Sequence, residues 1–278
     1  MKRLLLSACC AAALVAPMAN ATMISQWEVG TWTRFDLTTV EPTSGIDKIS
    51  DQELKWGTST GQGQSGITIT QGGSSGSPYL SSPVYTDGAG VNNVIITHHN
   101  RPITGTSLDA VTILSTLTLK PLVPSGSPLP SGTTDFKIQF EETTNDPRPS
   151  LCANGSPWGA GGDAKNQNGC ADIFVISKDA LNFVFPFADP DEPQNVRPYY
   201  LSFYETTGGF GTLPAAACTA AGASPGCMGF MTVEGQDNPA QFAVKITSLP
   251  WNPTPEPGTM ALFGLGLTGL ALRRRRKH

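Results

Sequence analysis

The segment Gln241–Thr247, QFAVKIT, places Phe242, Val244 and Ile246 on alternate positions, with mostly polar side chains between them. Successive side chains of a β-strand point to opposite faces, so this alternation is typical of a strand with one buried face. Phe136–Glu141, FKIQFE, has the same period. These two segments predict a fold built from half-buried strands.

Other segments extend this pattern over much of the chain. Val111, Ile113, Leu117 and Leu119 share one parity of a longer run, and stretches rich in Gly, Pro and Ser separate the apolar runs. No period of 20–50 residues repeats, which argues against solenoids and propellers. We therefore predict an all-β domain, a single, mostly antiparallel β-sandwich resembling a jelly roll. Further strands are expected at Thr31–Leu37, Leu54–Trp56, Ile67–Thr70, Asn93–Thr97, Ile173–Ser177, Asn182–Phe187, Tyr199–Glu205 and Phe230–Glu234.

The C-terminus combines a short apolar run with a block of positive charge. Residues 258–272 contain no charged side chain. As a helix they would span about 22 Å, against a hydrocarbon core of about 30 Å. A buried core helix gains nothing from adjacent cations, whereas at a membrane such cations stay cytoplasmic and reach the headgroups. We therefore predict a transmembrane helix at 258–272, followed by a basic tail at 273–278. The basic stop consists of Arg273, Arg274, Arg275, Arg276 and Lys277.

The N-terminus has the pattern of a secretory signal peptide. Two cations precede an apolar run at residues 4–16, and Ala19 and Ala21 form a small-x-small cleavage site. Cleavage there makes Thr22 the first residue of the mature chain. A lipoprotein signal with Cys9 as the acylated residue is the alternative, although only three apolar residues would precede its cleavage box. We therefore predict export.

Removal of the two terminal segments changes the charge of the remaining chain. Seven of the 18 basic residues and one of the 22 acidic residues lie in segments 1–21 and 255–278. Residues 22–254 therefore hold 11 basic and 21 acidic residues, and the net charge goes from −4 to −10. A domain this acidic offers no surface that neutralises phosphates, so nucleic acid is not an expected partner.

Four cysteines remain in the predicted exported domain. An even number of cysteines in an exported chain predicts two disulfides. Three pairings are possible, and we favour the one between nearest neighbours, Cys152 with Cys170 and Cys218 with Cys227. A zinc site is the alternative, but the sequence has no Cys-x-x-Cys spacing and no histidine close to these cysteines.

The order of motifs in the tail resembles a PEP-CTERM sorting signal, also called an ice-binding-protein C-terminal domain. Pro255, Glu256 and Pro257 precede the apolar run and the arginine block. The resemblance implies an exosortase as a processing partner, in addition to the signal peptidase that the N-terminal pattern predicts. It also implies export through the inner membrane of a Gram-negative bacterium and a final place at the cell surface or in the extracellular matrix. The two prolines hold the chain extended, as a protease requires of its substrate.

The most distinctive internal motif is Thr97-His98-His99-Asn100. It resembles the signature of the THxN family of PEP-CTERM proteins, with Thr97, His98 and Asn100 on the named positions. The resemblance supplies no activity. From the residues we expect a structural role, with Asn100 in a turn before Pro102 and His98 at a strand edge. A metal or ligand site at His98 and a catalytic base are the alternatives.

No pair of carboxylates and no nucleophile with a base has a spacing that indicates an enzyme. We therefore predict a non-enzymatic protein of the cell surface or exopolysaccharide matrix, structural or adhesive in biofilm or floc. A carbohydrate-binding module and a secreted hydrolase are the alternatives. No cofactor is expected apart from calcium, which oxygen-rich loops could hold. The calcium candidates are Asp163, Asn166, Asn168, Asp172, Asp189, Asp191 and Glu192.

Overall fold

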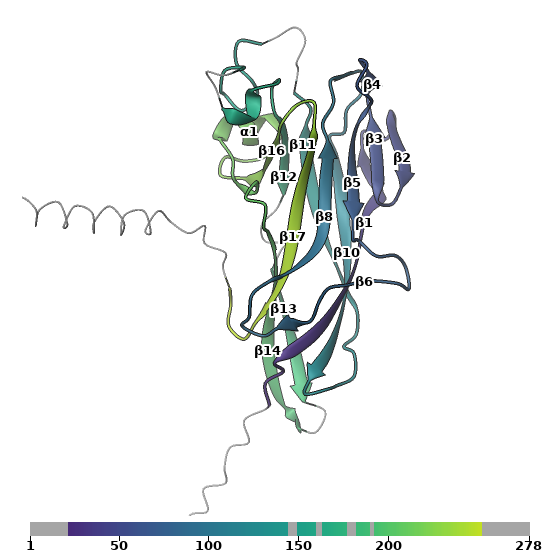
Figure 1. Ribbon diagram of the computed structural model, residues 1–278, viewed down its shortest axis with the longest axis vertical. Coiled ribbons are helices and arrows are strands. Elements are labelled where there is room, and N and C mark those ends of the chain that lie inside the picture. The colour runs from purple at the N-terminus through teal and green to yellow at the C-terminus, as the bar shows by residue number, and fades with distance from the viewer. Residues whose placement is uncertain (1–21, 144–148, 160–162, 177–181, 190–191, 252–278) are drawn as a thin grey trace, which may run out of the picture.

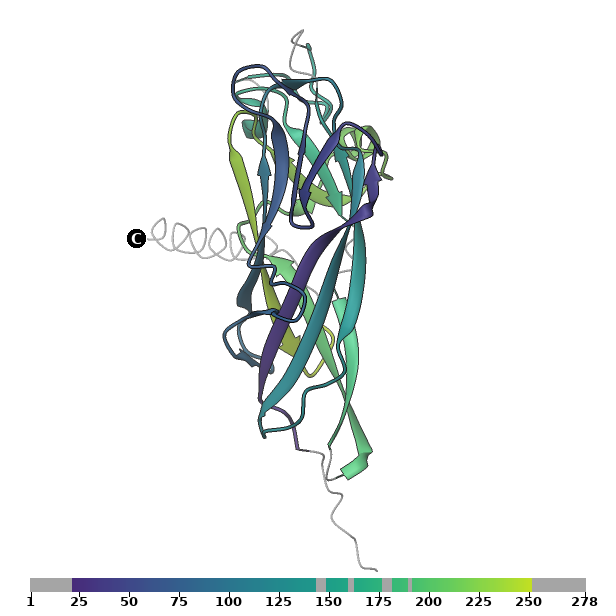
Figure 2. The ribbon, with the colours of Figure 1, turned by 90° about the vertical axis from the view of Figure 1, so that its right-hand side faces the viewer.

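Two antiparallel sheets pack against each other and give the molecule its elongated shape (Figure 1, Figure 2). The computed structural model describes residues 22–143, 149–159, 163–176, 182–189 and 192–251. The predicted signal peptide 1–21, the sorting segment 255–278 and its membrane run 258–272 lie outside these residues. Within the described part of the chain, no helix is long and apolar enough to cross a membrane.

The larger sheet contains eight strands. Its hydrogen-bonded order is β15-β16-β12-β11-β10-β1-β6, and β7 also pairs with β1. The strands are β1 (Gln26–Glu41), β6 (Tyr79–Leu80), β7 (Val84–Tyr85), β10 (Ala110–Val123), β11 (Gly132–Glu141), β12 (Asp172–Ile176), β15 (Gly211–Thr212) and β16 (Met228–Thr232).

The second sheet contains seven strands in the order β13-β14-β17-β8-β5-β3-β2. A small two-stranded sheet, one 3₁₀ turn at Ala164–Asn166 and the short helix α1 (Ala215–Ala220) complete the described structure. The strands are β2 (Ile46–Ser50), β3 (Glu53–Trp56), β5 (Ser65–Thr70), β8 (Val91–His99), β13 (Asn182–Asp189), β14 (Glu192–Glu205) and β17 (Asp237–Thr247), with β4 (Thr58–Ser59) and β9 (Ile103–Thr104) in the small sheet.

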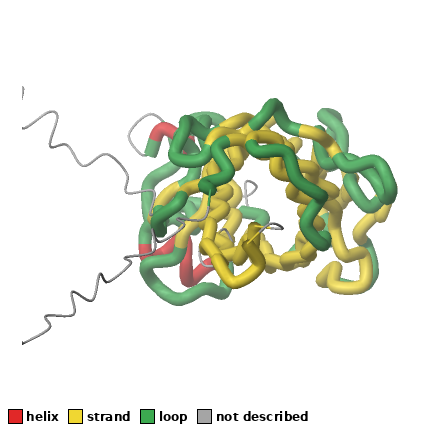
Figure 3. Tube along the Cα trace, turned by 90° about the horizontal axis from the view of Figure 1, so that it is seen from below, coloured by secondary structure: helices red, strands yellow, loops and turns green. Residues whose placement is uncertain are grey.

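The connections show how the chain builds the two layers. Strands β2, β3 and β5 pair in succession in the second sheet, and β10, β11 and β12 do so in the larger sheet. Between β5 and β8 the chain crosses to the larger sheet, where it forms β6 and β7 beside β1. Viewed along the long axis, the strands surround a central region with loops at the periphery (Figure 3). The predicted all-β, antiparallel fold is confirmed. The jelly-roll topology stays a prediction.

The core at the end of the molecule that holds the β13–β14 hairpin is built around Trp27 of β1, which is fully buried. Its ring packs edge-on against Phe185, Phe187 and Tyr199, with centroids 5.4, 5.7 and 5.0 Å away. The Tyr199 hydroxyl accepts a hydrogen bond of 2.7 Å from the backbone N–H of Ile24. Aromatic side chains bury the most area per residue, so this cluster fixes the start of β1 between the sheets.

The core at the opposite end contains side chains from both sheets. Phe35, Ile113 and Phe140 of the larger sheet pack with Trp56 and Ile96 of the second sheet, and all five are buried. The segments that decided the prediction, 241–247 and 136–141, lie within β17 and β11, and Phe242, Val244, Ile246, Ile138 and Phe140 are buried as their period predicts.

Candidate functional site

The Thr-His-x-Asn motif lies at the end of β8, where the strand alternation separates its members. His98 and Asn100 are 3% and 0% exposed, while Thr97 and His99 are partly exposed. Strand β8 is an inner strand between β5 and β17, so His98 does not act from a sheet edge as the sequence suggested. Both inward side chains point toward the larger sheet.

Thr232 of β16 forms hydrogen bonds with the two buried residues of the motif, His98 and Asn100. His98 Nδ1 is 2.9 Å from Thr232 Oγ1, and Asn100 Nδ2 donates a 3.2 Å bond to the Thr232 carbonyl. Thr232 Oγ1 itself donates to the Asp172 carbonyl at 3.4 Å, so it accepts from His98 and the histidine proton lies on Nδ1. Because β8 and β16 belong to different sheets, the motif ties the two sheets together.

The imidazole of His98 lies among aromatic rings. It stacks on Trp56 with centroids 5.8 Å apart and an interplanar angle of 12°, and it meets Phe140 and Phe174 edge-on at 5.4 and 4.8 Å. Burial disfavours the charged imidazolium and, with the nearby cations, lowers the pKa of His98 to about 3. The histidine is therefore neutral and acts as a packed polar group.

Two carboxyl groups lie near the histidine, the buried one of Asp172 and the partly buried one of Glu142. Asp172 Oδ2 is 4.0 Å from His98 Nε2, while Asp172 Oδ1 accepts bonds from the N–H and hydroxyl of Thr143 at 2.8 and 3.0 Å. Glu142 Oε2 accepts a 3.0 Å bond from Trp56 Nε1. We name His98, Asn100, Glu142, Asp172 and Thr232 the polar centre.

Burial sets the protonation of these carboxyl groups. It raises the pKa of Glu142 to about 8, and nearby Glu234 and Glu141 add to this effect. Burial and the neighbouring Glu142 raise the pKa of Asp172 well above its usual range. The 4.0 Å separation of His98 and Asp172 would define an ion pair if both were charged, but burial favours the neutral form of each. The polar centre is therefore a neutral network at pH 7.

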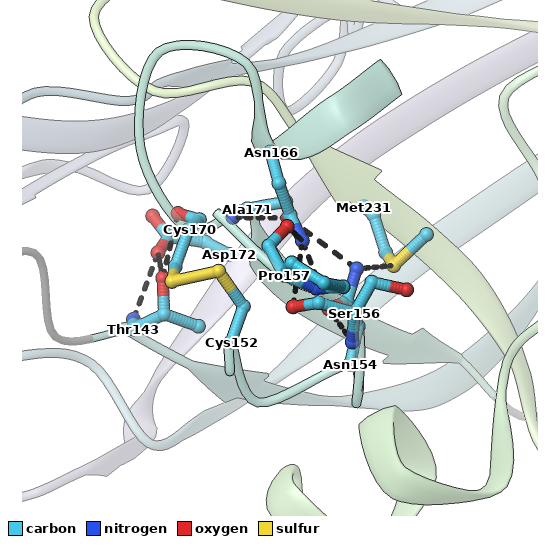
Figure 4. Close-up of a disulfide and its surroundings, with 10 residues drawn as sticks. All are labelled: Thr143, Cys152, Asn154, Ser156, Pro157, Asn166, Cys170, Ala171, Asp172 and Met231. Atoms are coloured by element: carbon cyan, nitrogen blue, oxygen red, sulfur yellow. Dashed lines mark hydrogen bonds between the residues drawn. A yellow bond between two sulfur atoms is a disulfide. The ribbon is translucent and has the colours of Figure 1, made fainter. Parts of the chain in front are cut away.

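The first disulfide lies beside the polar centre (Figure 4). Cys152 and Cys170 are bonded, as predicted, and the Cys170 carbonyl accepts a 2.7 Å bond from the Thr143 hydroxyl. In the same loop, Asn166 Nδ2 donates to Asn154 Oδ1 at 3.1 Å, and the Ala171 N–H donates to Asn166 Oδ1 at 3.1 Å. These bonds hold the entry into β12, and with it Asp172, in place.

The second disulfide joins Cys218 of α1 to Cys227, so the predicted pairing holds for both. Its surroundings are a small hydrophobic cluster that includes Ile173, Leu213 and Ala217. The helix lies beside β16 and β12 in Figure 1. The disulfide therefore closes a loop that covers the outer side of the larger sheet near the polar centre.

Replacement of both Cys218 and Cys227 by alanine is expected to lower the free energy of unfolding by about 2.5 kcal/mol, since the closed loop is short. The same change at Cys152 and Cys170 should cost about 3 kcal/mol, because that disulfide spans 18 residues instead of 9. Urea titration of the oxidised variants measures both values. A larger loss for the 218–227 pair would contradict this order.

A pocket of about 280 Å³ adjoins the polar centre, lined by His98 and Thr232 and by apolar side chains such as Phe174 and Phe230. Thr232, His98 and Asp172 have the composition of a hydroxyl–base–acid triad. However, a histidine with a pKa of about 3 is a weak base, far from the pH at which proton transfer is efficient. The arrangement supports a structural function better than hydrolysis.

The calcium candidates that the structure describes are engaged with other protein groups. Asp163 Oδ1 accepts from the Lys165 N–H at 2.8 Å, and Asn168 Nδ2 donates to the Glu234 carbonyl at 3.5 Å. Asn166 and Asp172 make the bonds given above. The side chains of Asp189, Asp191 and Glu192 lie outside the described residues. Across the described segments, no three His, Cys, Asp or Glu side chains are placed to hold a metal ion.

Sequence reasoning did not find the partners of the motif. Thr232 is 134 residues from His98, and Glu142 is 86 residues from Trp56. Asp172 entered only as a calcium candidate. One local signal was present, the strand period of Asn93–Thr97. If this period is extended by three residues, His98 and Asn100 lie on the same face of the strand.

The structure thus defines an all-β protein with two disulfides and a neutral polar centre between its sheets. Comparison with protein families finds the PEP-CTERM protein-sorting motif at residues 253–276, so the chain carries the sorting tail of PEP-CTERM proteins. This tail implies processing by an exosortase, export, and a membrane-associated passage to the cell surface. No curated protein and no solved structure matches the chain.

Proposed function

We propose that this chain is a structural or adhesive protein of the cell surface or exopolysaccharide matrix, acting in biofilm or floc. In this proposal residues 1–21 are a signal peptide removed by signal peptidase, residues 22–254 are the exported domain of a Gram-negative bacterium, and residues 255–278 are the sorting tail. The observation that carries it is the sorting motif at 253–276, which begins two residues after the last described residue, Trp251.

The polar centre supports a role without catalysis. His98 and Asn100 use their hydrogen bonds to join β8 to β16, and burial keeps both away from solvent. The resemblance to the THxN family remains a proposal, in which the motif fastens the two sheets. A protein that must persist outside the cell gains from such a tie and from two disulfides.

Simultaneous replacement of Pro255, Glu256 and Pro257 by alanine is expected to stop processing, because the proposed recognition element is removed. The uncut chain should accumulate in the membrane fraction, and the amount of released or surface-exposed protein should fall at least about tenfold, because a substrate without its recognition element is cleaved more slowly. Quantitative immunoblots of fractionated cells measure this. Leu249→Ala, an exposed change just before the motif, is the control. Unchanged release of the triple variant would contradict the proposal.

A deletion strain tests the role in the matrix. We expect reduced aggregation and an altered protein content of the matrix, both restored by the intact gene and not by the triple alanine variant. A deletion strain with unaltered aggregation and matrix composition would count against the matrix role, while leaving the assignment of the sorting tail in place.

A further inference from the structure

The outer face of the second sheet carries an aromatic side chain that is held in a fixed position. Trp251 meets the ring of Tyr204 edge-on, with centroids 4.9 Å apart, and Lys245 Nζ lies 4.8 Å from the centroid of the Trp251 ring. Tyr199, Leu201 and Phe203 of β14 belong to the core, so Tyr204 projects from the opposite face of the sheet. The tryptophan therefore covers the outside of β14 and β17, where it remains partly exposed.

A pocket of about 330 Å³ opens beside this ring. Trp251 and Tyr200 supply aromatic surface, and Asn182 and Ser202 supply polar groups. Ser202 Oγ donates a 2.7 Å bond to Asn182 Oδ1, which fixes the orientation of the amide and leaves its Nδ2 hydrogens as donors. The lining is completed by Phe183, Val184 and Pro250, and none of these seven side chains is charged.

This combination matches the chemistry of a sugar ring. One face of a pyranose presents C–H groups that pack on an aromatic ring, and its edge presents hydroxyls that accept or donate hydrogen bonds. A ring already held by Tyr204 and Lys245 loses little conformational freedom when a ligand stacks on it. The net charge of −10 on residues 22–254 derived above disfavours an acidic polymer. The lining itself contains no cation that would attract one, and the Lys245 ammonium is engaged with the Trp251 ring.

We infer that the pocket between Trp251, Tyr200 and Asn182 binds a sugar unit of a neutral polysaccharide. The sugar stacks on Trp251, and one of its hydroxyls accepts a hydrogen bond from Asn182 Nδ2. The inference deepens the proposed function and rests on it for the biological setting, since it names the class of matrix component that the exported domain contacts. Three other large aromatic residues, Trp27, Trp56 and Tyr199, are fully buried and cannot serve this purpose.

Affinity electrophoresis of the full chain in mild detergent tests the inference. Native gels contain hydroxyethyl cellulose or dextran as neutral probes and alginate as the acidic probe. We expect retardation in at least one neutral gel and none in alginate. Trp251→Ala should weaken the apparent affinity at least about tenfold and Asn182→Ala severalfold, a range typical of one lost stacking contact or hydrogen bond. Trp32→Ala, which removes a partly exposed tryptophan stacked on Arg34 and outside the pocket, should migrate like the wild type.

Two results would overturn the inference: no retardation of the wild type in either neutral gel, or equal retardation of the Trp251→Ala variant whose melting temperature matches the wild type. If Trp251→Ala lowers the melting temperature, Asn182→Ala alone decides, because its side chain is exposed and its loss leaves the aromatic contacts intact. A negative gel result with a positive deletion phenotype rejects only the sugar site. A positive gel result with no deletion phenotype rejects only the matrix role.

Discussion

Replacement of His98 by alanine is expected to lower the free energy of unfolding by about 3–5 kcal/mol. The variant loses the stacking on Trp56 and the contacts with Phe140 and Phe174, and it leaves a cavity between the sheets. It also removes the bond to Thr232 that links β8 to β16. Urea titration at pH 7, followed by tryptophan fluorescence, measures the loss.

Two further variants separate packing from hydrogen bonding at this position. His98→Phe retains an aromatic ring beside Trp56 but cannot bond to Thr232, so we expect a loss of about 1–3 kcal/mol. His99→Ala removes the neighbouring histidine, which is partly exposed and bonded to Asp237, and should cost less than about 1 kcal/mol. If His98→Ala costs no more than His99→Ala, the motif does not fasten the sheets.

Glu142→Gln is expected to raise the free energy of unfolding at pH 8 by about 2–4 kcal/mol and to leave it almost unchanged at pH 4. Burial raises the pKa of Glu142 from 4.5 to about 8, so the folded protein keeps a proton that the unfolded chain loses. Wild-type stability from this group is therefore complete below pH 4.5 and declines as the pH rises to 8. Glutamine carries no such proton, and its amide oxygen still accepts the bond from Trp56 Nε1.

The other members of the polar centre define the whole pH profile. Asp172→Asn should act in the same direction as Glu142→Gln, because the pKa of Asp172 is also raised. His98 acts in the opposite direction: its pKa is lowered from 6.5 to about 3, so its contribution is lost as the pH falls through that range. Together the three groups favour maximum stability near pH 4, because above that pH the losses from Glu142 and Asp172 outweigh the gain from His98.

Unfolding titrations from about pH 3 to 9 check this profile. Glu41→Gln, a change on the surface beside Lys137, should leave the profile close to that of the wild type. A Glu142→Gln variant that is less stable than the wild type at pH 8 would show that the carboxylate, and not the carboxylic acid, belongs to the folded state.

Strand periodicity predicted the layers of this fold where one face is apolar and the other polar. It predicted β1 only as Thr31–Leu37, whereas the strand runs from Gln26 to Glu41. Polar side chains within this strand lie inside and weaken its alternation: Thr31 bonds to Asn93 at 3.2 Å and Thr33 to Ser115 at 3.0 Å, and all four are buried. Polar residues that satisfy one another in the core interrupt the alternation on which the prediction depends.

The disulfides could be predicted because cysteines of exported chains become oxidised, and because cysteines that are neighbours in the sequence need only a short loop between them to pair. The helix α1 could not, since six residues are too few for a helical period. For the polar centre, the sequence supplied the motif and not its environment. Thr232, Glu142 and Asp172 join it through sheet pairings between distant segments, such as Asp172 opposite Thr232 in β12 and β16.

The C-terminal residue of the natural protein tests the central claim most directly. Mass spectrometry of the membrane and secreted fractions would identify it in each. Processing by an exosortase predicts that the exported form ends near Pro257 and lacks the segment from 258 to 278. If Arg273 to His278 are still attached to the protein at its final location, the tail is an anchor that the cell retains, and the proposed passage to the surface or matrix is wrong.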